Sequence, residues 1–316
     1  MLAIFLQSLP FFALIGLGYG AGRTGFFPPE ATAWLTRFVF YFALSAMLFG
    51  FAARLSIAEI FEPWFIVAYL WASLLVWALV TAIALLRRRP FAEAVVEAQC
   101  GVVGNTGFMG VPLLLALLGS GAAGPVITVL TVDLVVFSSL FTILIAVVRE
   151  GSASWRLLWV VGAGLLRNPM VVSIALGLAW AGMGLGLPGP VDDFLTILGA
   201  AATPCALFAI GASLAGRSAE RLAVAAWLST AKLLIHPAAA AVSALLVFRI
   251  EPGAALVMIA AAALPVAGNV FILAQQYKTA PQRVSAAILL SHVVAVVTLP
   301  AIIALAGGGA ATFTIP

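Results

Sequence analysis

Apolar side chains gather in ten long runs along the chain, and charged residues lie mainly between these runs. A helix needs about 20 residues to cross the hydrocarbon layer of a membrane, and each run reaches that length. The runs cover residues 2–22, 33–53, 63–86, 93–118, 124–148, 168–187, 193–215, 222–248, 253–277 and 282–306. The pattern therefore predicts an all-α, polytopic membrane protein with ten transmembrane helices. No Ala-x-Ala-like cleavage site follows the first run, so we expect that run to remain as a span.

The composition agrees with a protein whose solvent is the lipid bilayer. Apolar residues make up 64% of the 316 positions and charged residues 8%, whereas soluble domains have about 45–50% and about 25%. Too few charges are present to cover the surface of a soluble protein of this size. The same figures argue against a disordered chain, a disulfide scaffold and a nucleic-acid-binding protein.

The positions of the basic residues predict an orientation. Of the 15 Lys and Arg residues, 12 lie near loops that join odd-numbered to even-numbered runs, including the central linker, residues 150–167, and its flanking Arg149. Only Arg54 and Arg249 lie on the opposite side, and Lys232 lies within a run. By the positive-inside rule, both termini are expected outside the cytoplasm. The linker is amphipathic and aromatic, which favours a helix at the membrane interface.

The two halves of the chain carry matching features in the same order. Because five spans is an odd number, a second set of five would enter the membrane from the opposite side. The matching pairs are Gly16 with Gly177, Ser45 with Pro204, and Gly104 with Gly268. Their offsets are similar, at 161, 159 and 164 residues. We therefore predict a first repeat in residues 1–149, the linker in 150–167, an inverted second repeat in 168–306 and a tail in 307–316.

Helix-breaking residues stand in the middle of the fourth and ninth runs. The candidate substrate site comprises Gly104, Asn105, Thr106 and Pro112 in the fourth run, Pro265, Gly268 and Asn269 in the ninth, and the paired Ser45 and Pro204. Broken spans survive in lipid where they line a cavity enclosed by protein, and paired breaks in inverted halves are typical of a transporter binding site. Helix N-termini at the breaks would favour an anion. Asn105 and Asn269 could cap the broken ends and donate to a substrate carboxylate. The alternative is a pair of kinked helices whose glycines only permit close packing.

Four ionisable residues fall inside runs: Asp133, Lys232, His236 and His292. Such residues face a bundle interior or a cavity because they are costly in lipid. Asp133 is either an acid that couples transport to a proton or cation, or half of a structural ion pair with Lys232. Lys232 is correspondingly an anion attractor, a structural partner or a lysine that snorkels to the interface. For the two histidines, a buried hydrogen bond and a titrating role both remain open.

The chain lacks the sequence patterns of the usual intramembrane enzymes. It contains no His-Glu-x-x-His, Gly-x-Ser-x-Gly or Gly-x-Gly-Asp string, and no Walker A string for an ATP-driven pump. We therefore expect neither an enzyme nor a bound cofactor or metal. Glu93 and Glu97 share a helix face near the basic run at residues 87–89, which indicates a solvated or Arg-paired helix start.

Several strings resemble the bacterial auxin efflux carrier family, which is related to the plant PIN carriers and includes malonate carriers. They are Asn-Thr-Gly-Phe-Met-Gly-Val-Pro ending at Pro112, Gly-Asn-Val-Phe-Ile-Leu-Ala-Gln-Gln-Tyr from Gly268, residues 232–237, and Thr298-Leu-Pro300. The resemblance implies two inverted five-helix repeats, with spans 4 and 9 crossing at their breaks. It also implies a mobile transport domain of spans 3–5 and 8–10, and a scaffold of spans 1, 2, 6 and 7. Two departures concern Ser45, where the family often has proline, and His292, where a small hydroxyl residue is usual.

The function that this resemblance implies is secondary transport of a small organic anion or weak acid across the bacterial inner membrane. It further implies elevator-type alternating access and a homodimer formed through the scaffold. Either H⁺ or Na⁺ is expected as the coupling ion, and both termini are expected on the periplasmic side. The competing interpretations are a carrier like the bile-acid symporters, a cation/proton antiporter, and a passive channel or receptor.

Overall fold

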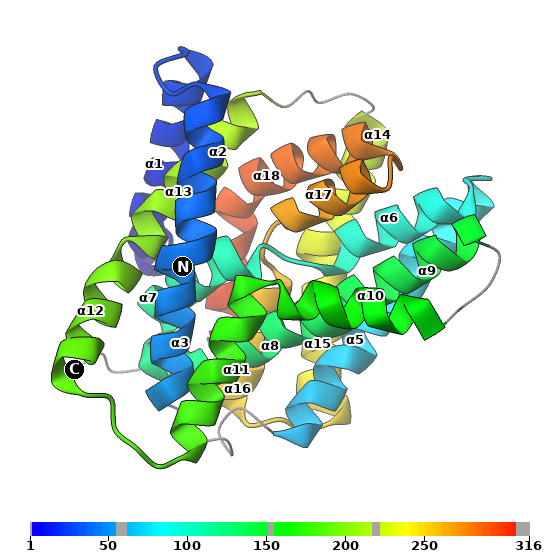
Figure 1. The fold of residues 1–316 in the computed structure, drawn as a ribbon. Coiled ribbons are helices and arrows are strands. Elements are labelled where there is room, and N and C mark those ends of the chain that lie inside the picture. The colour runs from blue at the N-terminus through cyan, green and yellow to red at the C-terminus, as the bar shows by residue number, and fades with distance from the viewer. Residues whose placement is uncertain (1, 55–61, 151–154, 217–221, 308–316) are drawn as a thin grey trace.

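In a computed structural model, the chain is nearly all helical in its described parts, which are residues 2–54, 62–150, 155–216 and 222–307 (Figure 1). Within these residues no β-strand is present apart from one isolated bridge between two residues. The helices are α1 (Leu2–Arg23), α2 (Pro29–Phe38), α3 (Leu44–Arg54), α5 (Pro63–Leu86), α6 (Phe91–Val102), α7 (Val111–Leu118), α8 (Ala123–Val132), α9 (Ser138–Glu150), α10 (Trp155–Leu166), α11 (Pro169–Gly182), α12 (Gly189–Ala200), α13 (Ala202–Ala215), α14 (Leu222–Thr230), α15 (His236–Ala241), α16 (Pro252–Ala262), α17 (Gly268–Gln276) and α18 (Pro281–Gly307).

Short turns of different pitch join several of these helices without ending them. They are the π-helical turns η1 (Val39–Ala43), η2 (Thr106–Gly110), η4 (Asp133–Phe137), η5 (Ala231–Ile235) and η6 (Val242–Val247), and the 3₁₀ turn η3 (Ser120–Ala122). A π-turn widens a helix by one residue, and such turns occur frequently at functional sites. Asp133 and Lys232, two of the predicted intramembrane charges, both lie in π-turns.

Six continuous helices in the described residues are long and apolar enough to cross a membrane, so the chain is a multi-pass membrane protein. They span Pro29–Arg54, Pro63–Leu86, Ser120–Val148, Gly189–Ala215, Leu222–Val247 and Pro281–Gly307. A seventh arises if α10 and α11, which meet at a bend of 74°, form one span. Each of the ten predicted runs contains helical structure, with non-helical breaks inside the fourth and ninth runs, whereas ten crossings and an inverted repeat stay predictions.

The helices pack in two groups. The first group consists of α1, α2, α3, α11, α12 and α13, in which α1 lies along α13 and α3 packs against α11 and α12. The second group consists of α5–α9 and α14–α18, in which α5 packs on α6 and α15, and α14 on α18. Figure 1 shows α1, α2, α12 and α13 on the left and α5, α6, α9 and α14 on the right.

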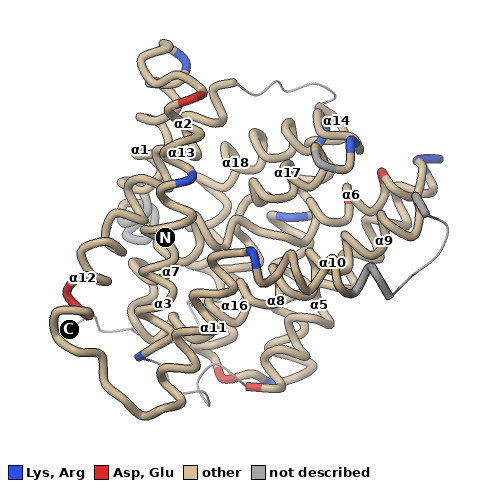
Figure 2. The backbone as a smooth tube through the Cα atoms, in the orientation of Figure 1, with Lys and Arg blue, Asp and Glu red and all other residues tan. Residues whose placement is uncertain are grey.

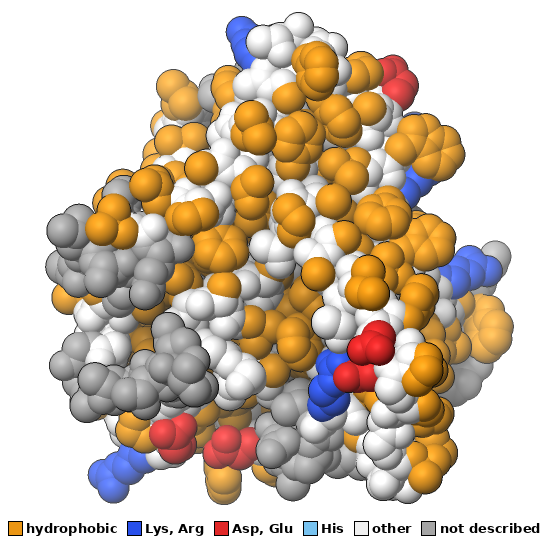
Figure 3. All heavy atoms as spheres, turned by 90° about the vertical axis from the view of Figure 1, so that its left-hand side faces the viewer, with side chains coloured by type: hydrophobic (Ala, Val, Ile, Leu, Met, Phe, Trp, Pro, Cys, Tyr) orange, Lys and Arg blue, Asp and Glu red, His pale blue; other side chains and the backbone are white. Residues whose placement is uncertain are grey.

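The outer surface of the first group is apolar. Figure 3 views the side on which α1 and α12 lie and shows mainly hydrophobic side chains, with few charges. Leu17 of α1 is 62% exposed, and Phe194 and Ile197 of α12 are 61% and 76% exposed. A soluble monomer rarely exposes so extended an apolar surface, whereas contact with lipid tails requires one. Charged residues lie mainly towards helix ends and in loops (Figure 2).

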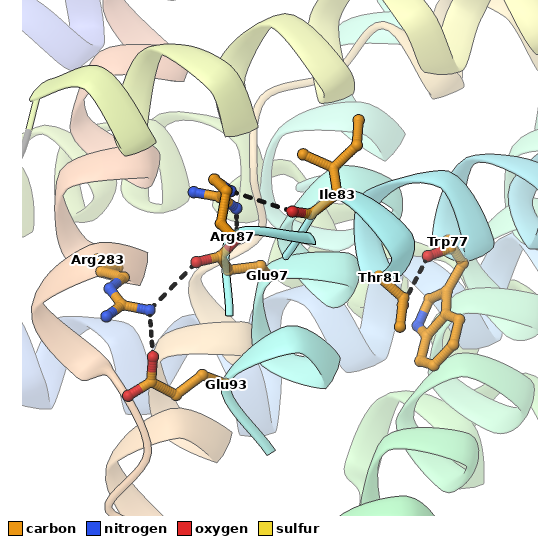
Figure 4. A network of polar contacts seen from close by, with 7 residues as sticks. All are labelled: Trp77, Thr81, Ile83, Arg87, Glu93, Glu97 and Arg283. Carbon is orange, nitrogen blue, oxygen red and sulfur yellow. Dashed lines mark hydrogen bonds and ion pairs between the residues drawn. The ribbon is translucent and has the colours of Figure 1, made fainter. Parts of the chain in front are cut away.

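An ion-pair cluster ties three helix ends of the second group together (Figure 4). Glu97 of α6, which is 1% exposed, accepts hydrogen bonds from Arg87 at the end of α5 and from Arg283 of α18. Arg283 also contacts Glu93, at 2.5 Å. The prediction of an Arg-paired helix start is confirmed, and the pairing joins residues almost 200 positions apart. Within this cluster, the buried Glu97 and Arg283 lie beside opposite charges, without which their burial would be very costly.

Candidate functional site

The breaks in the fourth and ninth apolar runs pair with each other through their backbones. Residues 103–105 lie between α6 and η2, and residues 263–267 lie between α16 and α17. The Asn105 amide donates to the Pro265 carbonyl at 2.8 Å, and the Ala267 amide donates to the Val103 carbonyl at 3.1 Å. Gly104 and Val266 form an antiparallel bridge. Each break therefore satisfies backbone groups that the other leaves free, which the apolar surroundings demand.

The local sequence explains why the chain can pass through this crossing. A Cβ atom on Gly104 would lie 3.2 Å from both Cε and Nζ of Lys232 and 3.3 Å from Cβ of Leu264, so glycine allows the close approach. Pro112 lies where η2 passes into α7, inside the helical segment that starts at Thr106, and it has no backbone N–H to donate there. Pro265 contributes the carbonyl that pairs with Asn105.

A cavity of about 740 Å³ lies against this crossing, between the two helix groups. Its lining includes Gly104 and Asn105 from one break and Gly268 and Asn269 from the other, together with Asp133. The remaining lining residues come from α2, η1, η2, α8, η4, α9, α11, α13 and α17 and are mostly apolar. The helical segments that follow the breaks start at Thr106 and Gly268, so two helix N-termini lie at the cavity. Free N–H groups and the helix dipole at such ends favour an anion.

The two asparagine side chains do not cap the broken helices, so that prediction is wrong. The Asn105 Nδ2 lies 3.3 Å from Nε2 of His292, whose Nδ1 lies 2.8 Å from the Ile288 carbonyl. A neutral imidazole that donates from Nδ1 and accepts at Nε2 satisfies both contacts. The Asn269 Oδ1 is buried and has no hydrogen-bond partner within the described residues. Asn105 is thus held in place by α18, whereas Asn269 retains hydrogen-bonding capacity.

Asp133 links the cavity to the start of a broken helix. The Tyr69 hydroxyl of α5 donates to its Oδ1 at 2.9 Å, and the Thr106 hydroxyl donates to its Oδ2 at 3.2 Å. The side chain is 2% exposed. Both carboxylate oxygens therefore have donors, and one of these donors belongs to the first residue of η2. A change in the charge of Asp133 would act directly on that helix start.

Lys232 and His236 lie behind the crossing and do not line the cavity. Lys232 is fully buried; its ammonium donates to the Ala262 carbonyl, at the end of α16, and lies 3.2 Å from Nδ1 of His236. The Nε2 of His236 lies 3.0 Å from the Ser73 hydroxyl. Among the described residues, no ion pair within 4.0 Å joins Asp133 to Lys232. The ammonium thus satisfies the last carbonyl of a half-helix rather than a carboxylate.

The other predicted site residues lie outside the cavity lining. Thr106 hydrogen-bonds to Asp133, and the ring of His292 contacts Asn105. Both therefore contact residues of the cavity lining without being part of it. The Ser45 hydroxyl donates to the Phe40 carbonyl at 2.9 Å, within its own helix. Pro204, the predicted repeat counterpart of Ser45, lies within α13. Pro112 and Pro265 shape the backbone at the crossing.

Sequence reasoning missed several polar residues of the cavity, of which Arg37 and Asn168 have the largest polar groups. Arg37 was counted as a topological charge near a loop, although its position inside the run 33–53 was a signal that it faces the interior. Asn168 precedes α11, and its side chain accepts a hydrogen bond from the Met170 amide at 3.0 Å. It therefore forms a helix cap at the cavity edge, as an Asn before a Pro-started helix predicts.

Comparison with known proteins decides the family. Residues 3–303 match the model of a family described as "Membrane transport protein". The chain belongs to the auxin efflux carrier family of membrane transport proteins. The carrier is also 35% identical over 308 residues to a protein of Rhizobium meliloti (strain 1021) named "Putative malonate transporter". The match covers 96% of this chain and 95% of that protein. Family and relative both indicate a transporter and not an enzyme.

Proposed function

We propose that this carrier moves a small carboxylate-bearing organic anion across the bacterial inner membrane, and that the anion binds in the cavity beside the crossing. The observation that carries the proposal is the paired break, which directs two helix N-termini and two asparagine amides to one cavity. All four groups offer N–H donors, which suit a carboxylate. The name of the relative makes malonate the first substrate to test.

We further propose elevator-type alternating access in a ten-span protein with two inverted halves. In this proposal the first helix group is the scaffold, through which two copies form a dimer, and the second group is the transport domain. The close packing of α1 on α13 and of α3 on α11 and α12 supports a rigid scaffold. Both breaks and their supporting side chains, Asp133, Lys232 and His292, belong to the second group. With the termini outside, as predicted, Arg37 and Asn168 belong to the cytoplasmic ends of their spans, and their place in the cavity lining supports an inward-facing state.

Coupling to a proton follows from the position of Asp133. A carboxylate in the lining of an anion site repels the substrate, and protonation of Asp133 removes that repulsion. Substrate binding and proton binding would therefore favour each other, which is the thermodynamic requirement for symport. Loss of the charge would also weaken the contact with Thr106 at the start of η2. Sodium is the alternative coupling ion, and sodium-coupled transport would not depend on a pH gradient.

Counterflow of radiolabelled malonate into proteoliposomes tests this proposal. We expect counterflow without any gradient, and faster net uptake when the side corresponding to the periplasm is acidified. Asp133→Asn should retain counterflow and lose the response to pH, because an amide of the same shape cannot be protonated. A wild type that ignores the pH gradient but responds to sodium would contradict proton coupling. Absence of counterflow for malonate and for other di- and monocarboxylates would contradict the function itself, and conductance without counterflow would indicate a channel.

A further inference from the structure

Arg37 is the one cation among the described residues that line the cavity. It lies in the last turn of α2, in the first helix group, whereas the two breaks belong to the second group. The cavity therefore has a guanidinium on one wall and the helix N-termini with the asparagine amides on another. These two sets of anion-binding groups come from different parts of the fold.

The Arg37 guanidinium has no acidic partner within 4.0 Å among the described residues. Its Cζ lies 4.9 Å from the centre of the Trp34 ring, one turn earlier in α2. A cation–π contact holds the guanidinium without neutralising its charge. This contrasts with Arg54, Arg87 and Arg283, each of which contacts a carboxylate. Arg37 thus keeps its hydrogen-bond donors for another anion.

A second cavity, of about 510 Å³, lies on the far side of Arg37. Thr36, Arg37 and Ser213 line both cavities, and Arg23 lines only the second. Arg37 is therefore placed between the substrate cavity and a second, basic space near the predicted cytoplasmic ends of α1 and α2. An anion that passes between the two spaces would contact this side chain.

We propose that Arg37 binds the second carboxylate of a dicarboxylate whose first carboxylate occupies the paired breaks, and so makes the carrier selective for dianions. The inference rests on the proposed function and names its substrate class. A planar guanidinium binds a carboxylate through two parallel hydrogen bonds, which a lysine ammonium cannot reproduce. A dianion satisfies both walls of the cavity at once. A monocarboxylate at the breaks leaves the guanidinium without an anion and gains nothing from it.

The experiment compares malonate with its monomethyl ester, which keeps the carbon skeleton and loses one charge. Uptake kinetics are measured in proteoliposomes for the wild type, Arg37→Gln and Arg37→Lys. Arg23→Gln serves as the matched control, because it removes the same charge from the second cavity only. We expect Arg37→Gln to raise the KM for malonate by about tenfold or more and to leave the KM for the monoester unchanged. Arg37→Lys should recover part of the malonate affinity, and Arg23→Gln should behave as the wild type.

Transport of the monoester by Arg37→Gln reports a folded carrier, so a loss confined to malonate cannot come from misfolding. An equal change in KM for both substrates, or no change for either, would overturn the inference. Preference of the wild type for the monoester would overturn it as well, while the proposed carboxylate transport would stand. Repeating the assay in liposomes without anionic lipid separates a lipid-headgroup contact from substrate binding. Selectivity that disappears in those liposomes would also contradict the inference.

Discussion

Alanine at position 269 is expected to weaken malonate binding by about ten- to a hundredfold, because a hydrogen bond to a charged group contributes about 1.5–3 kcal/mol. Asn269 lies in the first turn of α17, at the cavity, and its Oδ1 makes no hydrogen bond within the described residues. Alanine removes the two N–H donors of this amide from the site, and the Oδ1 that is lost with them accepts no hydrogen bond within the described residues. Equilibrium binding of radiolabelled malonate to the purified carrier measures the effect.

Two further variants, a second site variant and a control, are compared with Asn269→Ala. Asn105→Ala should weaken binding to a similar extent, although it also removes the contact with His292. Asn168→Ala is the matched control, since Asn168 lines the same cavity but uses its side chain to cap α11. It should cost about 1 kcal/mol of stability and change malonate affinity little. Unchanged affinity in both Asn105→Ala and Asn269→Ala would remove these residues from the site.

The second large effect is expected where α1 and α13 touch. A Cβ atom on Gly211 would lie 1.9 Å from the Ile15 carbonyl oxygen, and one on Gly18 would lie 2.1 Å from the Phe208 carbonyl oxygen. Backbone atoms cannot rotate away as a side chain can, so Gly211→Ala must push the helices apart. Overpacking of this kind typically costs about 1–3 kcal/mol. We expect the upper part of that range and a larger loss for the double variant with Gly18→Ala.

Thermal unfolding in detergent micelles measures this loss. Gly20→Ala is the matched control, because Gly20 lies on the same helix and a Cβ there would have no atom within 4 Å. Alanine favours a helix more than glycine does, so the control should be neutral or slightly stabilised. Equal unfolding midpoints for Gly211→Ala and the control would contradict the close contact between α1 and α13.

The helices and the breaks were predictable from the sequence because both follow from local chemistry. An apolar run of about 20 residues forms a helix in lipid, and glycine, proline and asparagine in its middle interrupt it. The partners of the broken ends were not predictable in the same way. Asn105 was expected to cap its own helix, but its side chain contacts His292, which is 187 residues away in the chain. Only the three-dimensional packing of α18 against α6 and α17 brings that imidazole to the break.

The contacts of Arg37, Asp133 and Lys232 were also not predictable from the sequence. Counting basic residues by loop uses only their place along the chain, so it cannot distinguish a charge at the membrane surface from one that turns into a cavity. The similar predicted depths of Asp133 and Lys232 in the membrane suggested that the two side chains could form an ion pair. Hydroxyl groups of Tyr69 and Thr106 reach the carboxylate instead, and the Ala262 carbonyl reaches the ammonium. The rotation of each helix about its own axis sets which neighbours its side chains face. An apolar run without a clear amphipathic face does not specify this rotation.

Substrate protection of a single cysteine tests most directly whether malonate occupies the cavity at the paired breaks. Ser138 lines this cavity, and the neighbouring Ser139 does not. In a background with Cys100 and Cys205 replaced by alanine, Ser138→Cys and Ser139→Cys are labelled with a thiol reagent while malonate is varied. The account predicts that malonate slows labelling of Ser138→Cys, with half-protection near its KM for transport, and leaves Ser139→Cys unaffected. Unprotected labelling of Ser138→Cys in a carrier that transports malonate would place the substrate elsewhere.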